Sequence, residues 1–405
     1  MKKLSVLLFL CAISCSIVAQ KETSKVLLIS FDGFRADYLS KTDTPNFDRL
    51  AQSGVLGEGL IPIYPSKTFP NHYAIATGLY PENNGFIANR MYDEKLGFLF
   101  SMGDREQVEN PNWWLGEPIW NTVEKAGKNA GTMFWVGSEA PIQNMSPTFW
   151  KSYDGRMPDE DRIDSVLAWM TLDTEKEIDF GTLYFSFVDS QGHRYGTESD
   201  EVIEAIKEAD DLVGYLISKL VEKKLIDRTN IIIVSDHGMM NVSKERLVVL
   251  DDYINTEHIE IIEGSPSLMM NVQEGKLEEV YSSLKKNETH FTVFKKDDIP
   301  ERFHIKNNHR TPDLLLVTEL GYTINTKAFI EGRNNYPSGG AHGFDNLEEE
   351  MWALFMASGP SFKEGFIMEP FENIHLYELI THLLQIEPAQ NDGSFEAVSK
   401  MLKQK

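Results

Sequence analysis

The chain has 405 residues, of which 41% are hydrophobic and 25% are charged, a composition typical of a globular protein that can bury a large core. Its formal net charge of −23 excludes the basic surface that binding to duplex nucleic acid requires. An acidic protein can still bind phosphate groups when metal ions supply the local positive charge.

The first residues predict a secretory signal peptide over 1–19. Two lysines precede a short apolar segment, and small residues follow up to Ala19. The apolar segment is too short for a comfortable membrane span. Cleavage after Ala19 therefore predicts an exported chain, periplasmic or extracellular, with no transmembrane segment in its mature form. A lipid attached to Cys15 is an alternative. Because Cys11 and Cys15 both lie in this leader, we expect no disulfide or thiolate metal site in the mature chain.

Five continuous apolar runs predict buried β-strands, at 25–33, 181–189, 230–238, 313–320 and 351–359. An amphipathic helix is predicted over 199–224, where one stripe holds Val202, Ile206, Ala209, Val213, Leu216 and Leu220. A second helix is predicted over 373–385. This alternation indicates an α/β fold, a three-layer α/β/α sandwich with a largely parallel central sheet.

The segment 84–160 has no clear strand or helix period but carries Trp113, Trp114, Trp120, Trp135 and Trp150. We expect it to run over one edge of the sheet. The sequence has no internal repeat and no linker rich in Pro, Gly or Ser. Residues 20–405 are therefore expected to form a single domain.

Acidic and imidazole side chains follow three of the predicted strands. They are Asp32 after the first, Asp189 after the second, and Asp236 and His237 after the third. In open α/β sheets, ligands bind outside the carboxyl ends of the strands. Three carboxylates gathered there would repel one another unless a positive ion lay among them. The pattern therefore predicts a metal site, with His193 and His342 as suitable further ligands.

Each of these motifs also has a plain structural explanation. The sequence Phe-Asp-Gly at 31–33 is a common turn. The one-turn spacing of Asp189 and His193 suits a helix, but Gly192 between them favours a loop. The glycines around His342 indicate either a loop without a role or a backbone that wraps closely round an ion. Asp236 and His237 before a glycine are more specific, because they offer two adjacent ligands where the chain turns.

The segment "YPSKTFPNHYAIATG" at 64–78 places Thr68 where a loop enters a predicted helix. The Thr68 hydroxyl is expected either to cap a helix from Asn71 onward or to act as a nucleophile, which needs a base or a metal to activate it. The two roles are compatible, because a helix N-terminus favours a bound phosphate. Lys67 is either an exposed surface lysine or a group that steers anions.

Together these motifs resemble the alkaline phosphatase superfamily, and more closely its nucleotide pyrophosphatase/phosphodiesterase family, over about residues 25–390. The resemblance rests on Asp32, "KTFPNHY", "IANRMYD", "DSQGH", "SDHG" and "GAHGF" in that order. It implies two zinc ions, one held by Asp189, His193 and His342, the other by Asp32, Asp236, His237 and the Thr68 oxygen. It also implies a phosphothreonyl intermediate on Thr68, with Asn89 and the Thr68 backbone amide binding the oxygen on which charge builds.

Relatives in this family divide between nucleotides and lysophospholipid or choline-phosphate esters as substrates. No arginine lies beside Thr68, which favours a phosphodiester over a monoester. Phe69 and Tyr153 are expected to contact a nucleotide base, and Trp135 and Tyr184 to complete an aromatic slot. Packing in a core is the alternative for each of these aromatic residues.

The resemblance thus implies a hydrolase that releases nucleoside 5′-monophosphates, with a small-molecule nucleotide or phosphodiester as its partner. A phosphodiesterase acting on phospholipid headgroups is an alternative with the same metal centre. A catalytically silent metal-dependent binding protein is an alternative of another class. Met102 lies where relatives have a leucine, and Arg105 lies near the position of a basic residue in nucleotide-cleaving relatives.

Overall fold

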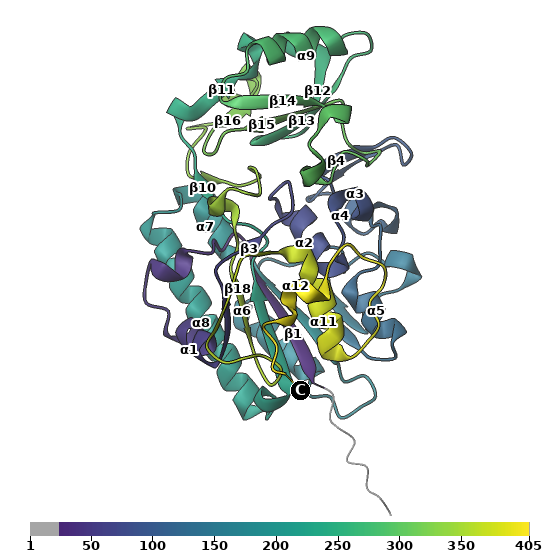
Figure 1. Cartoon of the computed structure of the whole chain (residues 1–405), viewed down its shortest axis with the longest axis vertical. Helices are drawn as coiled ribbons and strands as arrows, with labels where there is room; N and C mark the ends of the chain where they lie inside the picture. Colours follow the sequence, from purple (N-terminus) through teal and green to yellow (C-terminus); the bar gives the residue numbers. More distant parts are fainter. Residues whose placement is uncertain (1–23, 405) are drawn as a thin grey trace, which may run out of the picture.

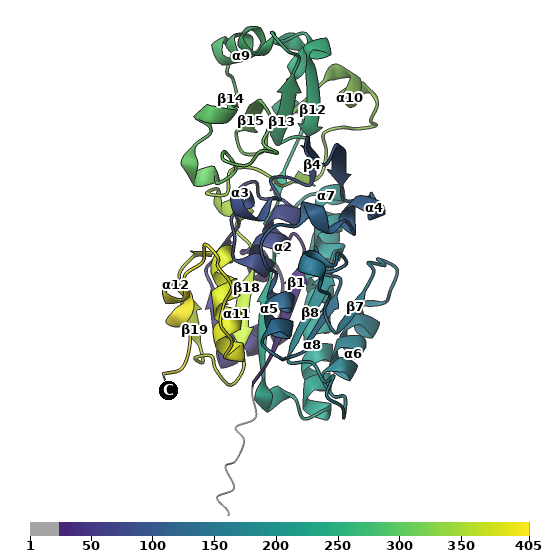
Figure 2. The same cartoon turned by 90° about the vertical axis from the view of Figure 1, so that its right-hand side faces the viewer.

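A computed structural model describes residues 24–404, and Figures 1 and 2 show it in two views. A large sheet lies between two layers of helices, and a smaller sheet forms a second lobe above it (Figure 1). The predicted three-layer α/β/α sandwich is confirmed, and most neighbouring strands of the large sheet pair in parallel. The predicted signal peptide lies outside the described residues.

Within residues 24–404, the central sheet has eight strands in the order β19-β2-β18-β9-β1-β8-β6-β7. They are β1 (Lys25–Phe31), β2 (Gly54–Gly57), β6 (Ala130–Met133), β7 (Phe149–Lys151), β8 (Phe180–Phe185), β9 (Thr229–Val234), β18 (Phe355–Ser358) and β19 (Phe366–Met368). Strand β1 pairs in parallel with β8 and β9, whereas β18 runs antiparallel to β9 and β2. The segment 84–160 supplies β6 and β7, so it extends the sheet as well as running over its edge.

Helices cover both faces of the central sheet (Figure 2). One layer holds α2 (Thr68–Thr77), α5 (Ile119–Lys125), α11 (Leu376–Leu384) and α12 (Phe395–Ser399). The other holds α1 (Pro45–Ser53), α6 (Asp159–Trp169) and α8 (Asp200–Glu222). The two predicted helices appear as α8, whose whole predicted stripe is buried, and as α11. In the described part of the chain, none of the helices is long and apolar enough to cross a bilayer.

The burial of strand β1 explains why the central strands have unbroken apolar sequences. Val26 and Leu28 pack in the cluster beneath α2, α5 and α11, whereas Leu27 and Ile29 pack in the cluster beneath α1, α6 and α8. Successive side chains of a strand point to opposite faces, so a strand with both faces buried needs an apolar residue at every position.

The second lobe is built on a four-stranded antiparallel sheet in the order β12-β13-β15-β14. Its elements are β12 (Ile259–Glu263), β13 (Ser267–Val272), α9 (Leu277–Lys286), β14 (Phe291–Lys295) and β15 (Leu314–Thr318). The run 313–320 was expected in the central sheet, but its strand β15 lies in this second sheet instead. Leu314 and Leu316 pack beneath α9, whereas Leu315 packs in the same hydrophobic cluster as α2, α5 and α11. This strand is therefore also buried on both faces.

The other α-helices and β-strands among residues 24–404 are short. They are β3 (Leu60–Ile61), α3 (Pro81–Asn84), β4 (Arg90–Asp93), β5 (Phe98–Ser101), α4 (Arg105–Val108), α7 (Phe187–Tyr195), β10 (Met240–Asn241), β11 (Leu247–Val249), β16 (Thr323–Asn325), α10 (Lys327–Glu331), β17 (Gly340–Ala341) and β20 (Phe371–Glu372). Strands β4 and β5 form an antiparallel hairpin, and β10 pairs antiparallel with β17.

A buried ion pair joins the β4–β5 hairpin to the segment that precedes β15. Arg310 Nε donates to Asp93 Oδ2 over 2.6 Å, and both side chains are only 2% exposed. The Arg310 guanidinium also donates to the carbonyl oxygens of Gly85 and Trp113, and His309 Nε2 lies 2.9 Å from Asp93 Oδ2. Although burial opposes it, the hydrogen bonds that Asp93 accepts from Arg310, from the Leu96 N–H and from His309 lower the pKa of Asp93 to about 2. The surroundings of Asp93 therefore stabilise its ionised form over its protonated form.

We expect Asp93→Asn to lower the free energy of unfolding at pH 7 by about 3 kcal/mol, because it leaves Arg310 buried without its ionic partner. The folded-state pKa of Asp93 lies below its unfolded value of about 3.9, so this stabilisation is present above about pH 4 and is lost as the pH falls toward 2. Urea unfolding at pH 7 and at pH 3 measures both effects. The matched control is Asp154→Asn, whose carboxylate pairs with the exposed Arg156. An equal loss at both pH values would contradict the assignment.

Candidate active site

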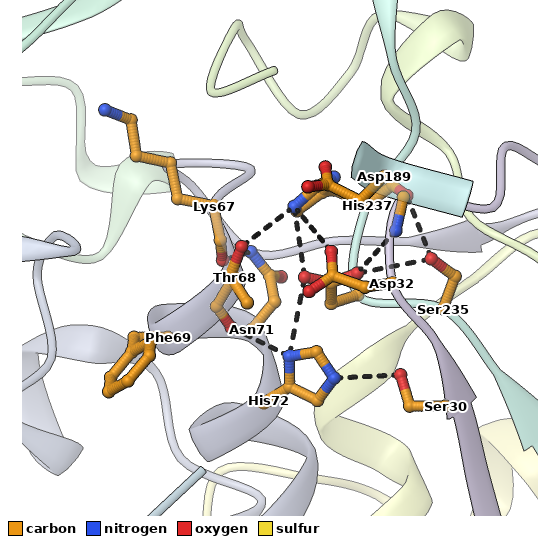
Figure 3. A network of polar contacts seen from close by, with 12 residues as sticks. Ser30, Asp32, Lys67, Thr68, Phe69, Asn71, His72, Asp189, Ser235 and His237 are labelled. Carbon is orange, nitrogen blue, oxygen red and sulfur yellow. Dashed lines mark hydrogen bonds and ion pairs between the residues drawn. The ribbon is translucent and has the colours of Figure 1, made fainter. Parts of the chain in front are cut away.

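The predicted metal ligands lie together at the carboxyl ends of β1, β8 and β9, below the second lobe. Asp32 directly follows β1, and Asp236 and His237 follow β9. Figure 3 shows the side chains of Asp32, His237 and Thr68 turned toward one another. These groups thus lie together at one edge of the sheet, as expected from the sequence.

Asp189 and His193 reach the site from a helix. Asp189 lies in the first turn of α7 and not at the end of β8, and His193 lies one turn further along the same helix. The expected loop at Gly192 is wrong, because α7 continues through it. A Cβ at this glycine would lie 3.1 Å from Met239 Cε, so the missing side chain lets α7 pack closely against the segment after β9.

Gly33 makes the approach of the three carboxylates possible. Its backbone has φ +67°, and a Cβ here would lie 2.8 Å from the Asp189 Cβ. Only glycine fits this position without strain. The Gly33 N–H donates to Asp236 Oδ1 over 3.2 Å, and the Asp189 N–H donates to the Asp32 carbonyl over 3.0 Å. The turn after β1 therefore aligns all three acids.

A first set of possible ligand atoms comes from Asp189, His193 and His342. His193 Nε2 lies 3.4 Å from Asp189 Oδ1 and 3.1 Å from His342 Nε2, and the last two atoms are 3.9 Å apart. His193 Nδ1 donates to the Gly340 carbonyl and His342 Nδ1 to the Ser66 carbonyl, each over 2.9 Å. Because Nδ1 carries the hydrogen in both rings, Nε2 is the nitrogen left for a cation.

The glycines before His342 allow this geometry. A Cβ at Gly339 would lie 2.0 Å from the His193 carbonyl oxygen, and one at Gly340 would lie 2.7 Å from Met239 Cγ. The segment is thus pressed against α7 and the chain after β9, and its backbone holds the His193 ring. The close approach of this backbone, and not loop mobility, accounts for the glycines.

A second set comes from Asp32, Asp236 and His237. His237 Nε2 lies 3.0 Å from Asp236 Oδ2, 3.5 Å from Asp32 Oδ1 and 3.3 Å from Thr68 Oγ1. His237 Nδ1 donates to the Gly238 carbonyl over 2.9 Å, which again leaves Nε2 for a cation. The His237 and His342 rings stack with centroids 3.6 Å apart, so the two sets adjoin.

Asp32 and Asp236 are each held on one carboxylate oxygen and left free on the other. Tyr184 O–H donates to Asp32 Oδ2 over 2.6 Å, and the Ser235 hydroxyl donates to Asp236 Oδ1 over 3.2 Å. Asp32 Oδ1, Asp236 Oδ2 and Asp189 Oδ1 are buried and have no hydrogen-bond partner among residues 24–404. A buried carboxylate oxygen without a partner is strongly unfavourable.

Electrostatics point to the same conclusion. Burial, followed by repulsion from Asp236 and Asp189, raises the pKa of Asp32 well above its usual range. Burial also raises the pKa of Asp189, against the opposing effect of the nearby His193. Cations among these oxygens would remove both the repulsion and the desolvation cost. Carboxylate oxygens with imidazole nitrogens are the donor set of divalent metals such as zinc, so the residues present fit such ions.

Thr68 is the first residue of α2, and Lys67 occupies the capping position. The expectation that the Thr68 hydroxyl caps a helix beginning at Asn71 is therefore wrong. Its Oγ1 instead faces His237. The Phe69 N–H donates to Asn89 Oδ1 over 2.9 Å, which holds the Asn89 side chain beside the start of the helix.

Lys67 is neither exposed nor free to steer anions. Its side chain is 6% exposed, its Nζ lies 2.8 Å from Glu263 Oε1, and it donates to the Gly264 carbonyl over 3.1 Å. Figure 3 shows it pointing away from the carboxylates. The ion pair joins the loop before Thr68 to β12 of the second lobe.

A cavity of about 270 Å³ opens beside Thr68, and its lining includes Asp32, Asp189, Phe69, Trp135, Tyr153 and Tyr184. All four aromatic residues predicted from the sequence thus line the same cavity. They differ in how exposed their rings are and in whether their polar atoms are already hydrogen-bonded. Tyr153 is 44% exposed. The Tyr184 hydroxyl is engaged with Asp32, and buried Trp135 donates from Nε1 to the His72 carbonyl. Arg105 also lines the cavity, paired with Glu139.

Sequence reasoning missed His72 as a member of the site. Its Nε2 lies 2.8 Å from the Ser30 hydroxyl, and its Nδ1 lies 3.0 Å from the Thr68 carbonyl and 3.4 Å from Asp236 Oδ2. Burial lowers the pKa of this ring. His72 follows Thr68 by one helical turn, which was the available signal, but its partners on β1 and after β9 have no local signature.

Comparisons with known proteins identify the family of this chain. The model of the type I phosphodiesterase / nucleotide pyrophosphatase family matches residues 26–345. The chain is 36% identical over 391 residues to human ectonucleotide pyrophosphatase/phosphodiesterase family member 5, covering 96% of this chain and 80% of that protein. It is 38% identical over 393 residues to the venom phosphodiesterase CdcPDE of Crotalus durissus collilineatus, covering 94% of this chain and 47% of that protein.

A solved structure is similar as well. It is murine ectonucleotide pyrophosphatase/phosphodiesterase 5, described as an inactive threonine-to-alanine variant in complex with AMP. The TM-score is 0.89 at 36% identity, and the match covers 94% of this chain and 100% of that one. The present chain therefore spans the whole of this murine structure but less than half of the venom relative.

We expect added Zn²⁺ to raise the unfolding temperature of the chelator-treated protein, because binding to the folded state stabilises it by about 2.7 kcal/mol at a free concentration of 100 Kd. Asp32→Asn should abolish most of this rise. In chelator the same variant should unfold at a higher temperature than the wild type, because it removes repulsion among the buried carboxylates.

Calorimetry with and without zinc measures both effects. Asp164→Asn, which changes an exposed acid on α6, is the matched control and should keep the full rise. An Asp32→Asn protein that is destabilised in chelator and still gains the full rise would contradict the predicted ligand role.

Proposed function

The chain belongs to the type I phosphodiesterase / nucleotide pyrophosphatase family and is a hydrolase, and we propose that it cleaves phosphodiester and pyrophosphate bonds of nucleotides and releases nucleoside 5′-monophosphates. The observation that carries the proposal is the position of Thr68. Its hydroxyl lies 3.3 Å from His237 Nε2 within the acid–imidazole cluster and lines the same cavity as Phe69 and Tyr153.

The proposed cofactors are two zinc ions. Asp189, His193 and His342 would hold one, and Asp32, Asp236, His237 and Thr68 Oγ1 would hold the other. The unpartnered carboxylate oxygens and the Nε2 atoms left free by backbone hydrogen bonds support this division. When bound, such ions lower the pKa of a coordinated hydroxyl or water and neutralise charge on the phosphoryl oxygens.

In the proposed reaction, Thr68 Oγ1 attacks phosphorus in line with the departing group. A bond forms between Oγ1 and phosphorus, the bond to the leaving oxygen breaks, and the Thr68 proton is released. Asn89 and the Thr68 backbone N–H donate to the non-bridging oxygen on which charge builds. The N-terminus of α2 favours the anion at the same place. A water molecule then cleaves the phosphothreonyl bond and regenerates the hydroxyl.

Nucleotide selectivity is proposed to come from the aromatic side of the cavity. Phe69 and Tyr153 would contact the base, because both line the cavity and Tyr153 keeps an exposed ring. Trp135 and Tyr184 would complete the slot while also supporting His72 and Asp32. The complex of the similar murine protein with AMP supports a nucleotide as the occupant.

The domain boundaries and location are also proposed. Residues 20–405 would form a single phosphodiesterase catalytic domain after removal of a signal peptide at 1–19. The exported protein would act in the periplasm or outside the cell, with a lipid on Cys15 as the alternative anchor. The names of the similar human and venom proteins support a location outside the cytoplasm.

We expect Thr68→Ala to abolish hydrolysis of p-nitrophenyl thymidine monophosphate in the presence of zinc, because it removes the attacking oxygen. Thr68→Ser keeps a hydroxyl and should retain measurable turnover. Asn89→Ala should lower kcat by about 100-fold, the typical cost of losing one donor to the developing oxyanion. Full turnover by Thr68→Ala would exclude the threonine intermediate, and a wild-type protein without turnover would favour the silent binding protein.

Competition between p-nitrophenyl thymidine monophosphate and p-nitrophenyl phosphocholine tests the substrate class. The nucleotide should be preferred, and Tyr153→Ala should lower its kcat/KM by about tenfold, because base stacking on an aromatic ring contributes about 1–3 kcal/mol. The control is Trp150→Ala, an exposed aromatic on β7 outside the cavity lining. Preference for phosphocholine would favour the phospholipid-headgroup alternative.

A further inference from the structure

A buried guanidinium on α6 joins two of the segments on the aromatic side of the cavity, the loop of Tyr153 and the end of β8 that carries Tyr184. Arg162 lies in the first half of α6 and is 3% exposed. Its Nε and Nη2 donate to the Met157 carbonyl over 3.2 and 2.9 Å, and its Nη1 donates to the Tyr184 carbonyl over 3.0 Å. Nη1 also lies 3.0 Å from Asp159 Oδ1, so the charge is paired.

The segment that most needs this support is the loop carrying Tyr153. Residues 152–158 have no regular secondary structure, and the Tyr153 ring is 44% exposed. Arg162 donates to the carbonyls of Gly155 and Met157 within this loop. The Tyr153 N–H donates to Glu139 Oε2 over 3.1 Å, and Arg162 restrains the part of the loop that follows Tyr153.

Phe134 links the same guanidinium to the Tyr153 ring. It follows β6 with φ 66°, a backbone conformation that is unfavourable for a bulky side chain. The Arg162 guanidinium lies 5.2 Å from the Phe134 ring centroid. The Phe134 ring in turn meets the Tyr153 ring edge-on, with centroids 5.3 Å apart and an interplanar angle of 80°. The strained residue thus packs between the buried cation and the exposed ring.

We infer that Arg162 is a positioning residue for nucleotide selectivity: anchored to the end of β8, it holds the loop of Tyr153 in the arrangement that receives a planar base. The inference rests on the proposed nucleotide substrate. The guanidinium fork is required, because its donors reach carbonyl oxygens of two elements in one plane. A lysine would keep the charge but not the geometry. Figure 2 shows α6 beside β8, the element that also carries Tyr184.

The test compares two phosphodiesters, p-nitrophenyl thymidine monophosphate and methyl p-nitrophenyl phosphate, which share a leaving group but differ in the presence of a base. For Arg162→Lys we expect KM for the nucleotide to rise by about tenfold with kcat little changed, since part of the base stacking is lost. The kinetic constants for the methyl ester should stay within about twofold. Arg156→Lys on the same loop is the matched control, because its exposed side chain pairs with Asp154.

A double-mutant cycle separates positioning from general stability. If Arg162 acts through Tyr153, then Arg162→Lys in a Tyr153→Ala background should raise KM no further. Additive effects, or equal losses with both esters, would overturn the inference while leaving the proposed function intact. A wild-type protein that cleaves the methyl ester but not the nucleotide would overturn both.

A second variant covers the case in which Arg162→Lys does not fold. Phe134→Leu leaves the guanidinium and its hydrogen bonds in place but removes the ring beneath Tyr153. It should show the same selective rise in nucleotide KM, and an unchanged KM would overturn the inference. Thermal unfolding of each variant checks that the kinetic comparison is made on folded protein.

Discussion

Asp32, Asp189 and Asp236 converge from three elements, the first and last buried and Asp189 half-buried, so the repulsion among their carboxylates constrains how the site is built. One oxygen of Asp32 and one of Asp236 are held by hydrogen bonds, and one oxygen of each acid has no partner within the described residues. Divalent cations bound among these oxygens, as proposed above, would remove the repulsion and the cost of burying the charges. The Nδ1 atoms of His193, His237 and His342 are engaged with backbone carbonyls, which leaves their Nε2 atoms toward the carboxylates for the proposed cations.

Contacts around the same cluster also hold Thr68, the proposed nucleophile. The loop before Thr68 and the loop of His342 are joined by reciprocal contacts, since Ser66 accepts from His342 on its carbonyl and from the Gly343 N–H on its hydroxyl. The Lys67–Glu263 pair fixes the same loop to the second lobe. The loop that carries His342 therefore also positions Thr68, so the proposed attacking oxygen and the proposed ligand cluster are held by the same contacts.

The parts of the site that could be predicted are those with a local signature. Asp32 and Asp236 follow unbroken apolar runs, and strand ends meet at one edge of a sheet whatever the rest of the fold does. Thr68 and the nearby Asn89 were likewise placed by motif order. The helix that carries Asp189 and His193 could not be predicted, because Gly192 suggests a break in a helix. Its contact with Met239, which explains the glycine, is visible only in the fold.

Features set by long-range contacts could not be predicted. The run 313–320 is buried on both faces, so its composition matches a central strand although it lies in another sheet. Lys67 has the local sequence of a surface lysine and is buried only because Glu263 lies opposite. Arg162 contacts mainly backbone carbonyls, which leave no trace in the identities of the residues that carry them.

Anomalous diffraction at the zinc absorption edge, on crystals grown with zinc, tests the central claim most directly. Two peaks are expected, about 3.5–4 Å apart, one among Asp189, His193 and His342 and the other among Asp32, Asp236 and His237. A cluster without a peak at full zinc supply, or peaks only at surface acids, would show that these carboxylates are neutralised in another way and would contradict the account.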